Sequence, residues 1–340
     1  MKASNPQRVR KDNLFFLMSL IREYGPLSKR ELSEKSGLSV VTINKLIPEL
    51  LSKELIEPYS TDVVTGGRYA ISYTFNQNKC HSLIIKMVEK EKEMFFYFYV
   101  CDLLGEIIEE KEISGENLEW LDILSLIESF KKEYPKIKAI VLGIPGVEKS
   151  GVITLVDYPV LQGKNIKDEL EERFDCTVLV ENDVNAAILG FSKKEEAHLI
   201  IAGIYYPVGF PPGGGVSIGQ KLLKGRNNFV GEVAMLPLNV DWSEKNIPHV
   251  DLKNHFLDIA KTFISLYDPH QIVVYLSKSR LTKQQLTDIK QALEVVFPLL
   301  KLPEIVISEK FNHDYFLGLE SLGLEALNQV LKNEIEIGEL

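Results

Sequence analysis

The chain has 340 residues, of which 45% are hydrophobic and 26% are charged, a composition typical of a globular protein with a large core. This length favours two or three domains over one. The formal net charge of −9 excludes a protein that coats nucleic acid, yet residues 1–75 carry a net +3 and the remainder −12. A basic N-terminal unit on an acidic body permits local contact with DNA.

The cysteines and histidines give no sign of a metal site. Cys80, Cys101 and Cys176 are far apart and odd in number, so we expect buried free thiols rather than disulfides or thiolate ligands. The six histidines form no HxxxH or HxH pair. Since the chain also lacks a long uncharged apolar run and an N-terminal signal-like segment, we expect a cytoplasmic protein with no membrane partner.

The first 56 residues predict a helix followed by a helix-turn-helix. Apolar residues recur at helical spacing over 13–21, and Gly25-Pro26 ends that helix. Ser28 and Glu31 form the pattern of a capping box, which predicts a short helix through Lys35. A glycine at position 37 then supplies the turn, and Ser39 caps a second helix.

In such a motif the first short helix braces against the phosphate backbone and the second presents its N-terminal residues to the major groove. Ser, Thr, Asn and Lys side chains suit that face because they hydrogen-bond to base edges and phosphates. Pro48 is a departure, since a proline inside a helix removes a hydrogen bond and bends the chain. The predicted DNA contacts in these two helices are Ser28, Lys29, Ser39, Val40, Thr42, Asn44 and Lys45.

A hairpin is expected after Ile56. The segment 59–76 reads as two short strands around Thr65-Gly66-Gly67, with period-two alternation over 69–73. On this hairpin, the wing, Arg68 is placed to enter a narrow minor groove, whose negative potential attracts a guanidinium. The alternative interpretation of this unit is a helical module for protein contacts.

From about residue 80 strands and helices alternate, which predicts an α/β body. We expect two lobes with a cleft near residues 183 and 232. The predicted divisions are a winged helix-turn-helix domain over 1–77, a first α/β lobe over 78–195 and a second over 196–340. The last helix, about 314–332, is expected to pack back on the body.

Four segments together resemble the repressor, open-reading-frame and kinase (ROK) family of the sugar-kinase and actin-like superfamily. They read TGGRYAISY, LGIPGVEKSGVI, NIKDELEERFDCTVLVENDVNAAILG and GQKLLKGRNNFVGE. The resemblance runs from about residue 13 to the C-terminus. It implies an N-terminal winged helix-turn-helix on a two-lobed body of the actin-like, ribonuclease H-like kind.

The resemblance also implies sugar-binding positions. In kinases of this family the aspartate of the E-N-D-x-N-A stretch is the catalytic base and the adjoining asparagine holds the sugar, which here are Asp183 and Asn182. Glu232 matches a further sugar contact, and Asp157 lies near a fourth. Three of these positions have a purely structural alternative, in which Asn182 caps a helix, Asp183 complements its dipole and Glu232 pairs with a cation.

The nucleotide-binding segments depart from the family pattern. The place of the first phosphate loop, a D-x-G-x-T-like turn, reads KMVEKEKEM, with three glutamates that would repel a triphosphate. The second reads VGFPPGGGVSIG, in which Pro211 and Pro212 remove backbone donors. A glycine pair expected after residues 272–274 is replaced by Tyr275-Leu276-Ser277. We therefore expect no ATP as cofactor and no catalytic residue, with Asp183 only a vestige of the base.

The family's zinc site is also missing. Met235 stands where a histidine is expected, and no cysteine follows Cys176, so no zinc cofactor is expected. The first hypothesis is thus a DNA-binding regulator, a repressor of carbohydrate-related genes. Its expected partners are a duplex operator, a sugar or sugar-phosphate effector, and its own copies as a homodimer or dimer of dimers.

Two alternatives remain open on the sequence. The chain could be a sugar kinase with a fused DNA-binding head, for which Asp183 is the only support. It could also be a regulator whose body no longer binds sugar and serves as a dimerisation platform or as a sensor of another ligand.

Overall fold

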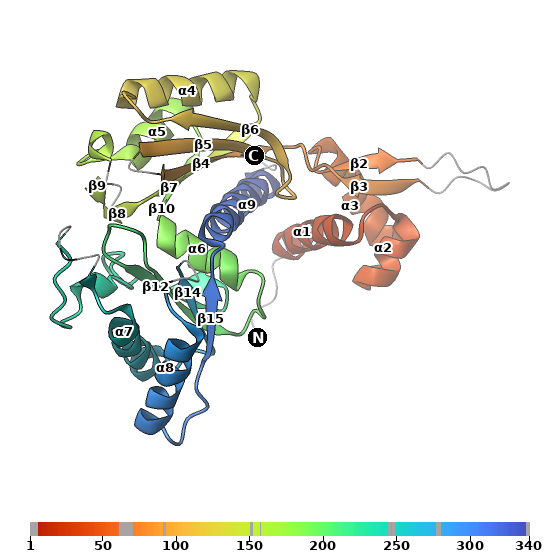
Figure 1. Ribbon diagram of the computed structural model, residues 1–340. Coiled ribbons are helices and arrows are strands. Elements are labelled where there is room, and N and C mark those ends of the chain that lie inside the picture. Colours follow the sequence, from red (N-terminus) through yellow and green to blue (C-terminus); the bar gives the residue numbers. More distant parts are fainter. Residues whose placement is uncertain are drawn as a thin grey trace.

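The computed structural model describes residues 6–60, 71–90, 93–149, 152–156, 158–243, 246, 249–276 and 280–337. Three parts follow one another along the chain (Figure 1). A helical head with a small sheet comes first, and two α/β lobes follow it. The predicted tip of the wing, with Arg68, and the candidate ligand residue Asp157 lie outside the described residues.

The head contains three helices and a three-stranded antiparallel sheet of order β1-β3-β2. Its elements are α1 (Pro6–Tyr24), β1 (Leu27–Ser28), α2 (Lys29–Ser36), α3 (Val40–Ser52), β2 (Ile56–Tyr59) and β3 (Ser72–Phe75). The capping box predicted at Ser28 and Glu31 is present, and Gly37 ends α2 in the left-handed region with φ 71°. The helix α3 continues through Pro48 to Ser52.

The first lobe is built on a five-stranded sheet of order β10-β7-β4-β5-β6. Strands β10, β7 and β4 are parallel, whereas β5 and β6 are antiparallel to their neighbours. Its elements are β4 (His81–Lys90), β5 (Glu93–Cys101), β6 (Ile107–Ser114), α4 (Trp120–Glu133), β7 (Ile137–Ile144), β8 (Gly146–Lys149), β9 (Val152–Val156), a 3-10 turn (Pro159–Leu161), α5 (Ile166–Phe174), β10 (Thr177–Asn182) and α6 (Asp183–Ser192).

The second lobe repeats this topology. Its sheet has the order β13-β12-β11-β14-β15, so in both lobes the strands, numbered within each sheet, run 3-2-1-4-5. Its elements are β11 (Ile200–Tyr205), β12 (Gly213–Ile218), β13 (Lys221–Leu222), a 3-10 turn (Val233–Met235), α7 (Leu252–Tyr267), β14 (Gln271–Tyr275), α8 (Lys283–Val296), β15 (Glu304–Ser308) and α9 (Phe311–Ile337). The repeated order is the two-lobed architecture expected from the sequence.

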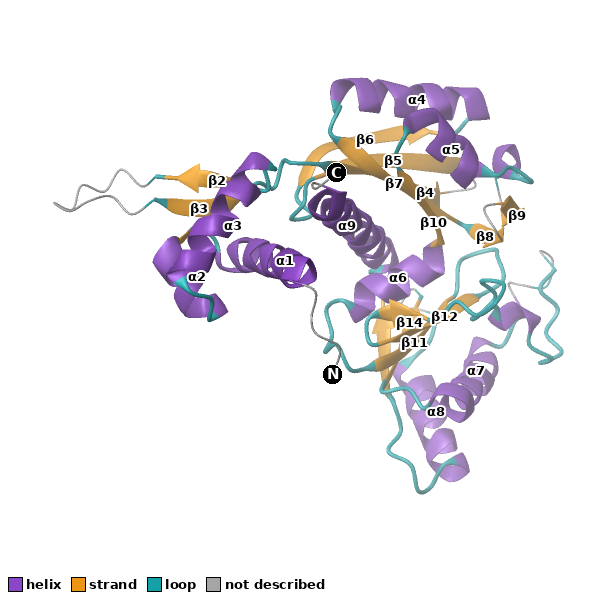
Figure 2. Ribbon diagram, turned by 180° about the vertical axis from the view of Figure 1, so that it is seen from behind, coloured by secondary structure: helices purple, strands orange, loops and turns teal. Residues whose placement is uncertain are grey.

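The helices α6 and α9 lie between the two sheets, while α4 and α5 cover the outer face of the first (Figures 1 and 2). The other two helices of the second lobe, α7 and α8, share a separate core with its sheet. Two glycines bring α6 and α9 into backbone contact, because a Cβ at Gly190 would lie 1.9 Å from the Asp314 carbonyl oxygen and one at Gly318 would lie 1.8 Å from that of Ala186. Neither position therefore accommodates a side chain without separating the helices.

The C-terminal part of α9 shares one hydrophobic core with the head. Ala326, Leu327, Leu331 and Ile335 are buried together with the apolar residues of α1, α2 and α3. Polar contacts reinforce the junction. Arg22 donates to Asn328 Oδ1 at 2.9 Å and to the Leu103 carbonyl oxygen. The last helix, expected to pack back on the body, thus contacts both the body and the head.

Candidate functional site

The helix α3, predicted to contact DNA, has a buried face and an exposed face. Ile43, Leu46, Ile47 and Leu50 are buried in the core of the head. The exposed face, called here the α3 stripe, comprises Val40, Val41, Asn44, Lys45 and Pro48. These positions follow the helical period, so they form one continuous surface. Three of the predicted DNA contacts, Val40, Asn44 and Lys45, lie on this stripe.

The N-terminus of α3 is held by its cap. Ser39 Oγ accepts a hydrogen bond from the Thr42 backbone N–H at 3.1 Å and lies 2.9 Å from Thr42 Oγ1. The two hydroxyls therefore bond mainly to the helix and to each other. At the start of α2, Ser28 is used in the same way, since its hydroxyl and backbone N–H donate to Glu31 Oε2 at 2.7 and 2.8 Å. These two serines and Thr42 thus build the motif as well as bordering its surface.

Lys29 joins α2 to the α3 stripe. Its Nζ donates to Asn44 Oδ1 at 2.9 Å. Because the carbonyl end of this amide faces Lys29, the Nδ2 end remains available as a donor. The one carboxylate on α3, Glu49, accepts from Arg10 Nη2 at 2.7 Å. The stripe itself therefore carries a cation and a donor, and none of its five residues is acidic.

The second candidate site is the junction of β10 and α6. Asn182 caps α6, because its Oδ1 accepts from the backbone N–H groups of Val184 and Asn185 at 2.9 and 3.0 Å. Its Nδ2 donates to the Gly146 carbonyl oxygen at 2.9 Å. Asp183 Oδ1 accepts from the Val184 N–H at 2.8 Å. The structural roles considered for Asn182 and Asp183 are thus present, since both side chains accept hydrogen bonds from the first turn of α6.

Two further carboxyl groups bear on the predicted ligand site, Glu181 at the end of β10 and Glu232 before the 3-10 turn of the second lobe. Glu181 is buried, and its Oε2 lies 2.7 Å from Lys224 Nζ. Glu232 is half-buried, and desolvation raises the pKa of its carboxyl group. The pairing with a cation considered for Glu232 is not seen among the described contacts. Glu181 instead has that arrangement, a pairing that the sequence did not suggest.

The loop in the place of the second phosphate segment, residues 206–212, connects β11 to β12. At its start the Tyr205 ring stacks on Phe311 of α9, with centroids 3.8 Å apart and an interplanar angle of 11°. Arg280 Nη1 donates to the carbonyl oxygens of Tyr206 and Pro207 at 2.7 and 3.2 Å. Burial, followed by the negative charge of Asp183, raises the pKa of Tyr205 to about 12. A neutral aromatic pair and an anchored loop therefore stand beside Asp183.

In the place of the first phosphate loop the chain forms the paired ends of β4 and β5, with Glu89 opposite Met94 and Lys90 opposite Glu93. Within β4, Lys86 is buried, and its Nζ lies 4.9 Å from the centroid of the Tyr97 ring. Burial lowers the pKa of this ammonium to about 8. A regular antiparallel ladder leaves few free backbone N–H groups for a phosphate.

The residues do not fit the zinc site of the resembled family. Met235 is 68% exposed, and a thioether does not supply the nitrogen ligand of that site. Across the described ranges no group of three or more His, Cys, Asp and Glu side chains is arranged to hold a metal ion. The cysteines are free, with Cys80 and Cys101 buried and Cys176 half-buried. Burial raises the pKa of the Cys80 and Cys101 thiols to about 12, so both stay protonated.

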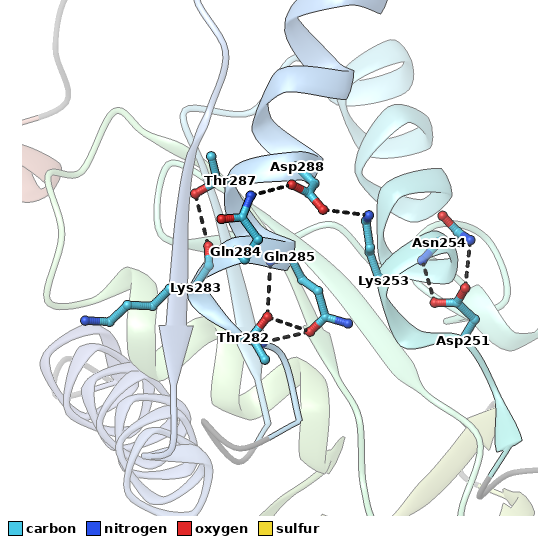
Figure 3. A network of polar contacts seen from close by, with 9 residues as sticks. All are labelled: Asp251, Lys253, Asn254, Thr282, Lys283, Gln284, Gln285, Thr287 and Asp288. Carbon is cyan, nitrogen blue, oxygen red and sulfur yellow. Dashed lines mark hydrogen bonds and ion pairs between the residues drawn. The ribbon is translucent and has the colours of Figure 1, made fainter.

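A cavity of about 410 Å³ lies in the second lobe, around the first turn of α7. The candidate ligand residues that the structure describes, Asn182, Asp183 and Glu232, do not line it. Neighbouring polar contacts fix this turn, because Asp251 caps α7 by accepting from the Asn254 N–H at 3.2 Å and Lys253 bonds to Asp288 of α8 at 2.8 Å (Figure 3). The residues lining the cavity are Leu238, Asn239, Val240, Asp241, Asn246, His249, Val250, Asp251, Asn254, His255 and Asp258.

Comparison with known proteins addresses the resemblance directly. The model of the ROK family matches residues 95–246. The "Putative xylose repressor" of Caldicellulosiruptor sp. (strain Rt8B.4) is 24% identical over 366 residues, covering 96% of this chain and 89% of that protein. Residues 95–246 of this chain are therefore related to the ROK family. Three of the four segments that carry the resemblance, LGIPGVEKSGVI, NIKDELEERFDCTVLVENDVNAAILG and GQKLLKGRNNFVGE, lie within this region, so the match confirms the resemblance there.

Other relatives match a shorter region. The "DNA-binding transcriptional dual regulator NagC" of Escherichia coli (strain K12) is 25% identical over 240 residues, or 67% of this chain. The matched region spans 58% of the length of that relative. Among solved structures, a ROK family transcriptional regulator described as a homolog of the E. coli MLC protein superposes with a TM-score of 0.64 at 16% identity, covering 96% of this chain and 99% of that one. This superposition confirms the fold of a head followed by a two-lobed ROK body.

No helix within the described residues is long and apolar enough to cross a membrane.

Proposed function

We propose that this chain is a DNA-binding transcriptional regulator of the ROK family, a repressor of carbohydrate-related genes, whose body does not phosphorylate sugars. The α3 stripe carries the proposal. It combines an exposed ammonium, an oriented amide donor and two apolar side chains on a capped helix-turn-helix. This is the chemistry that reads duplex DNA in the major groove. Relatives named as a DNA-binding transcriptional dual regulator and as a putative xylose repressor support the same conclusion.

The body supports regulation over catalysis. A kinase must neutralise the charge of a triphosphate beside the base. Near Asp183 the chain instead has the Tyr205–Phe311 stack, and the Arg280 guanidinium bonds to loop carbonyls rather than remaining free for a phosphate. The alternative of a sugar kinase with a fused head therefore has only Asp183 in its favour, and we infer that neither ATP nor zinc is a cofactor.

The effector of this proposal is a sugar or sugar phosphate held near Asp183 and Glu232. Glu232 is half-buried and burial raises the pKa of its carboxyl group, whose oxygens can form hydrogen bonds with hydroxyl groups. Two copies of the chain would place two heads on neighbouring half-sites, as symmetric operators require. Ligand binding would then change the separation of the heads only if it favours one arrangement of the body.

The test is binding of the full chain to DNA fragments that surround its own gene, measured by fluorescence anisotropy at several salt concentrations. We expect one fragment to bind at least a hundred-fold tighter than random DNA, with an affinity that falls as salt rises. Equal affinity for all fragments contradicts the proposal. ATP turnover with a panel of hexoses and amino sugars should stay at background, and turnover above background would establish the kinase instead.

Effector binding is tested separately by thermal unfolding with sugars and sugar phosphates. A ligand present at a hundred times its Kd should stabilise the folded chain by about 2.7 kcal/mol. If no sugar shifts the unfolding temperature while specific DNA binding persists, the body is a dimerisation platform or a sensor of another ligand. Sedimentation of the free and DNA-bound chain gives the number of copies.

A further inference from the structure

Two valines at the start of α3 are exposed although the helix has an apolar face of its own. Val40 is 50% exposed and Val41 is 66% exposed, whereas Ile43, Leu46 and Ile47 are at most 3% exposed. The valines belong to the α3 stripe and not to the core of the head. Burying an apolar side chain is favourable, and these two exposed valines do not gain that free energy within the head. A partner that covers the first turn of α3 would bury both valines and gain this free energy on binding.

The surroundings of the two valines indicate which partner that is. One helical turn further along, the stripe carries the Asn44 amide and the Lys45 ammonium. Lys29 lies alongside, bonded to Asn44 Oδ1. The nearest carboxylate on the helix, Glu49, is held by Arg10. A basic border around an apolar pair complements a polyanion with apolar groups on its inner surface, which describes the major groove of DNA.

We propose that Val40 and Val41 pack against thymine C5-methyl groups in each operator half-site, so that these two residues set a requirement for thymine. An isopropyl group neither donates nor accepts a hydrogen bond, so it cannot distinguish bases by their polar edges. The thymine methyl is the apolar group that the four standard bases present in the major groove. This inference rests on the proposed function and adds the base that the head selects.

The amide beside the valines completes the assignment. An asparagine that reads adenine uses Oδ1 and Nδ2 together. Here Lys29 holds Oδ1, so Asn44 presents N–H donors to the base next to the thymine contact. The acceptors available there are purine N7, guanine O6 and thymine O4. We therefore expect the half-site to contain a thymine and, next to it, a base whose major-groove acceptor receives a hydrogen bond from Asn44 Nδ2.

The experiment begins with selection of binding sequences from a random duplex pool by the full chain. Each thymine of the selected half-site is then replaced by deoxyuridine, which lacks the C5-methyl and keeps every hydrogen-bonding group. We expect one or two positions at which this replacement weakens binding about three- to five-fold, the effect of one lost methyl contact. Thymines outside the half-site should be insensitive.

Two valine variants identify the residues that make the contact. V40A and V41A should each weaken binding to the thymine duplex by a similar factor. Each should also abolish the effect of deoxyuridine at the position that its valine contacts, because the methyl then has no partner. Alanine favours the helix and both sites are exposed, so circular dichroism should show an intact head. The matched control is V295A on α8, which is 81% exposed and should leave both affinities unchanged.

The outcomes separate this inference from the proposed function. Specific binding without any deoxyuridine-sensitive position in the half-site overturns the thymine assignment and leaves the regulator intact. Sensitivity that survives in both V40A and V41A overturns it as well, since another residue then reads the methyl. A pool that yields no enriched sequence overturns both the assignment and the proposed function.

Discussion

The helices α3 and α6 both begin with a polar side chain that caps them, but the first residues of α3 are exposed and α6 is buried. Ser39 caps α3 and Asn182 caps α6, each by accepting a hydrogen bond from a backbone N–H two or three residues ahead. After the first cap, Val40 and Val41 face solvent. After the second, every residue from Val184 to Ser192 is buried. A polar residue at the start of a helix therefore shows where the helix begins. Whether a ligand can reach that residue depends on how the neighbouring side chains are packed.

The largest loss of stability is expected from a substitution that separates the buried helix α6 from α9. In G318A the new Cβ would meet the Ala186 carbonyl oxygen, a backbone atom that cannot rotate away. We expect a loss of about 3 kcal/mol or more in the free energy of unfolding, measured in urea, because the overpacking is against backbone. The control is G323A on the same helix, whose Cβ would meet the Ser82 side chain at 3.0 Å. Equal losses in the two variants would contradict the backbone contact.

A second change tests the middle of α9. Burial, partly offset by Arg22 and Lys193, raises the pKa of the Glu320 carboxyl to about 7. The folded state then binds this proton more tightly than the unfolded state, so the associated stability is full below pH 4.5 and is lost as pH rises to about 7. E320Q should be more stable than the parent by roughly 2 kcal/mol at pH 8 and equal to it below pH 4.5.

The measurement for Glu320 is urea unfolding at pH values from 4 to 8. Glu325 is exposed on the same helix, and E325Q serves as the control whose difference from the parent should be small at every pH. A difference between E320Q and the parent that does not change with pH would show that packing, and not proton binding, distinguishes them.

The third test removes the caps of α6 and α3 in turn, with the variants N182A and S39A. N182A removes the cap of α6 and the bond to the Gly146 carbonyl oxygen, so we expect a loss of about 1–2 kcal/mol in the free energy of unfolding. S39A should cost about 1 kcal/mol. Affinity for DNA should fall in S39A and remain unchanged in N182A. A fall in N182A alone would place the DNA surface elsewhere.

A second substitution at Ser39 distinguishes an effect on the stability of the head from an effect on DNA binding. An aspartate is as good a cap as serine, so S39D should retain the stability of the parent. Its added negative charge lies on the α3 surface and should reduce affinity for DNA at least ten-fold at low salt, less at high salt. A variant that binds DNA as the parent does would exclude this turn from the interface.

The smallest stability effect is expected at Lys29. Its bond to Asn44 is on the surface, so K29M should change the free energy of unfolding by less than about 0.5 kcal/mol. In DNA binding, the slope of log affinity against log salt should fall by about 1 if Lys29 also contacts a phosphate. An unchanged slope together with altered preference at the base read by Asn44 would make Lys29 a positioning residue only.

Much of the fold was predictable because its signals are local. The capping box at Ser28, the turn at Gly37 and the cap at Ser39 follow from hydrogen bonds between residues two to four apart. The alternation of strands and helices expected from about residue 80 is also present. The last helix was expected over 314–332 but spans Phe311–Ile337, and the first begins at Pro6, seven residues before its apolar pattern. The ends of both helices lie outside the apolar pattern from which they were predicted, so their lengths were underestimated.

The candidate sites were less predictable, because they depend on contacts between distant residues. Nothing near Asp314 in the sequence shows that it is buried and bonded to Lys194 Nζ at 2.5 Å and to the Tyr275 hydroxyl at 2.9 Å. The stack of Tyr205 on Phe311 joins residues more than a hundred positions apart. The exposure of Val41 depends on which face of α3 meets α1. Arg68 and Asp157 stay predictions, since the structure does not describe them.

The shared core of α9 and the head has a consequence for protein engineering. Leu327, Leu331 and Ile335 contribute to the interior of the head although they belong to the last turns of α9. A hybrid protein made by joining residues 1–77 to the body of a relative would lack these side chains and expose the head's core. A stable graft must therefore carry the end of α9 together with the head.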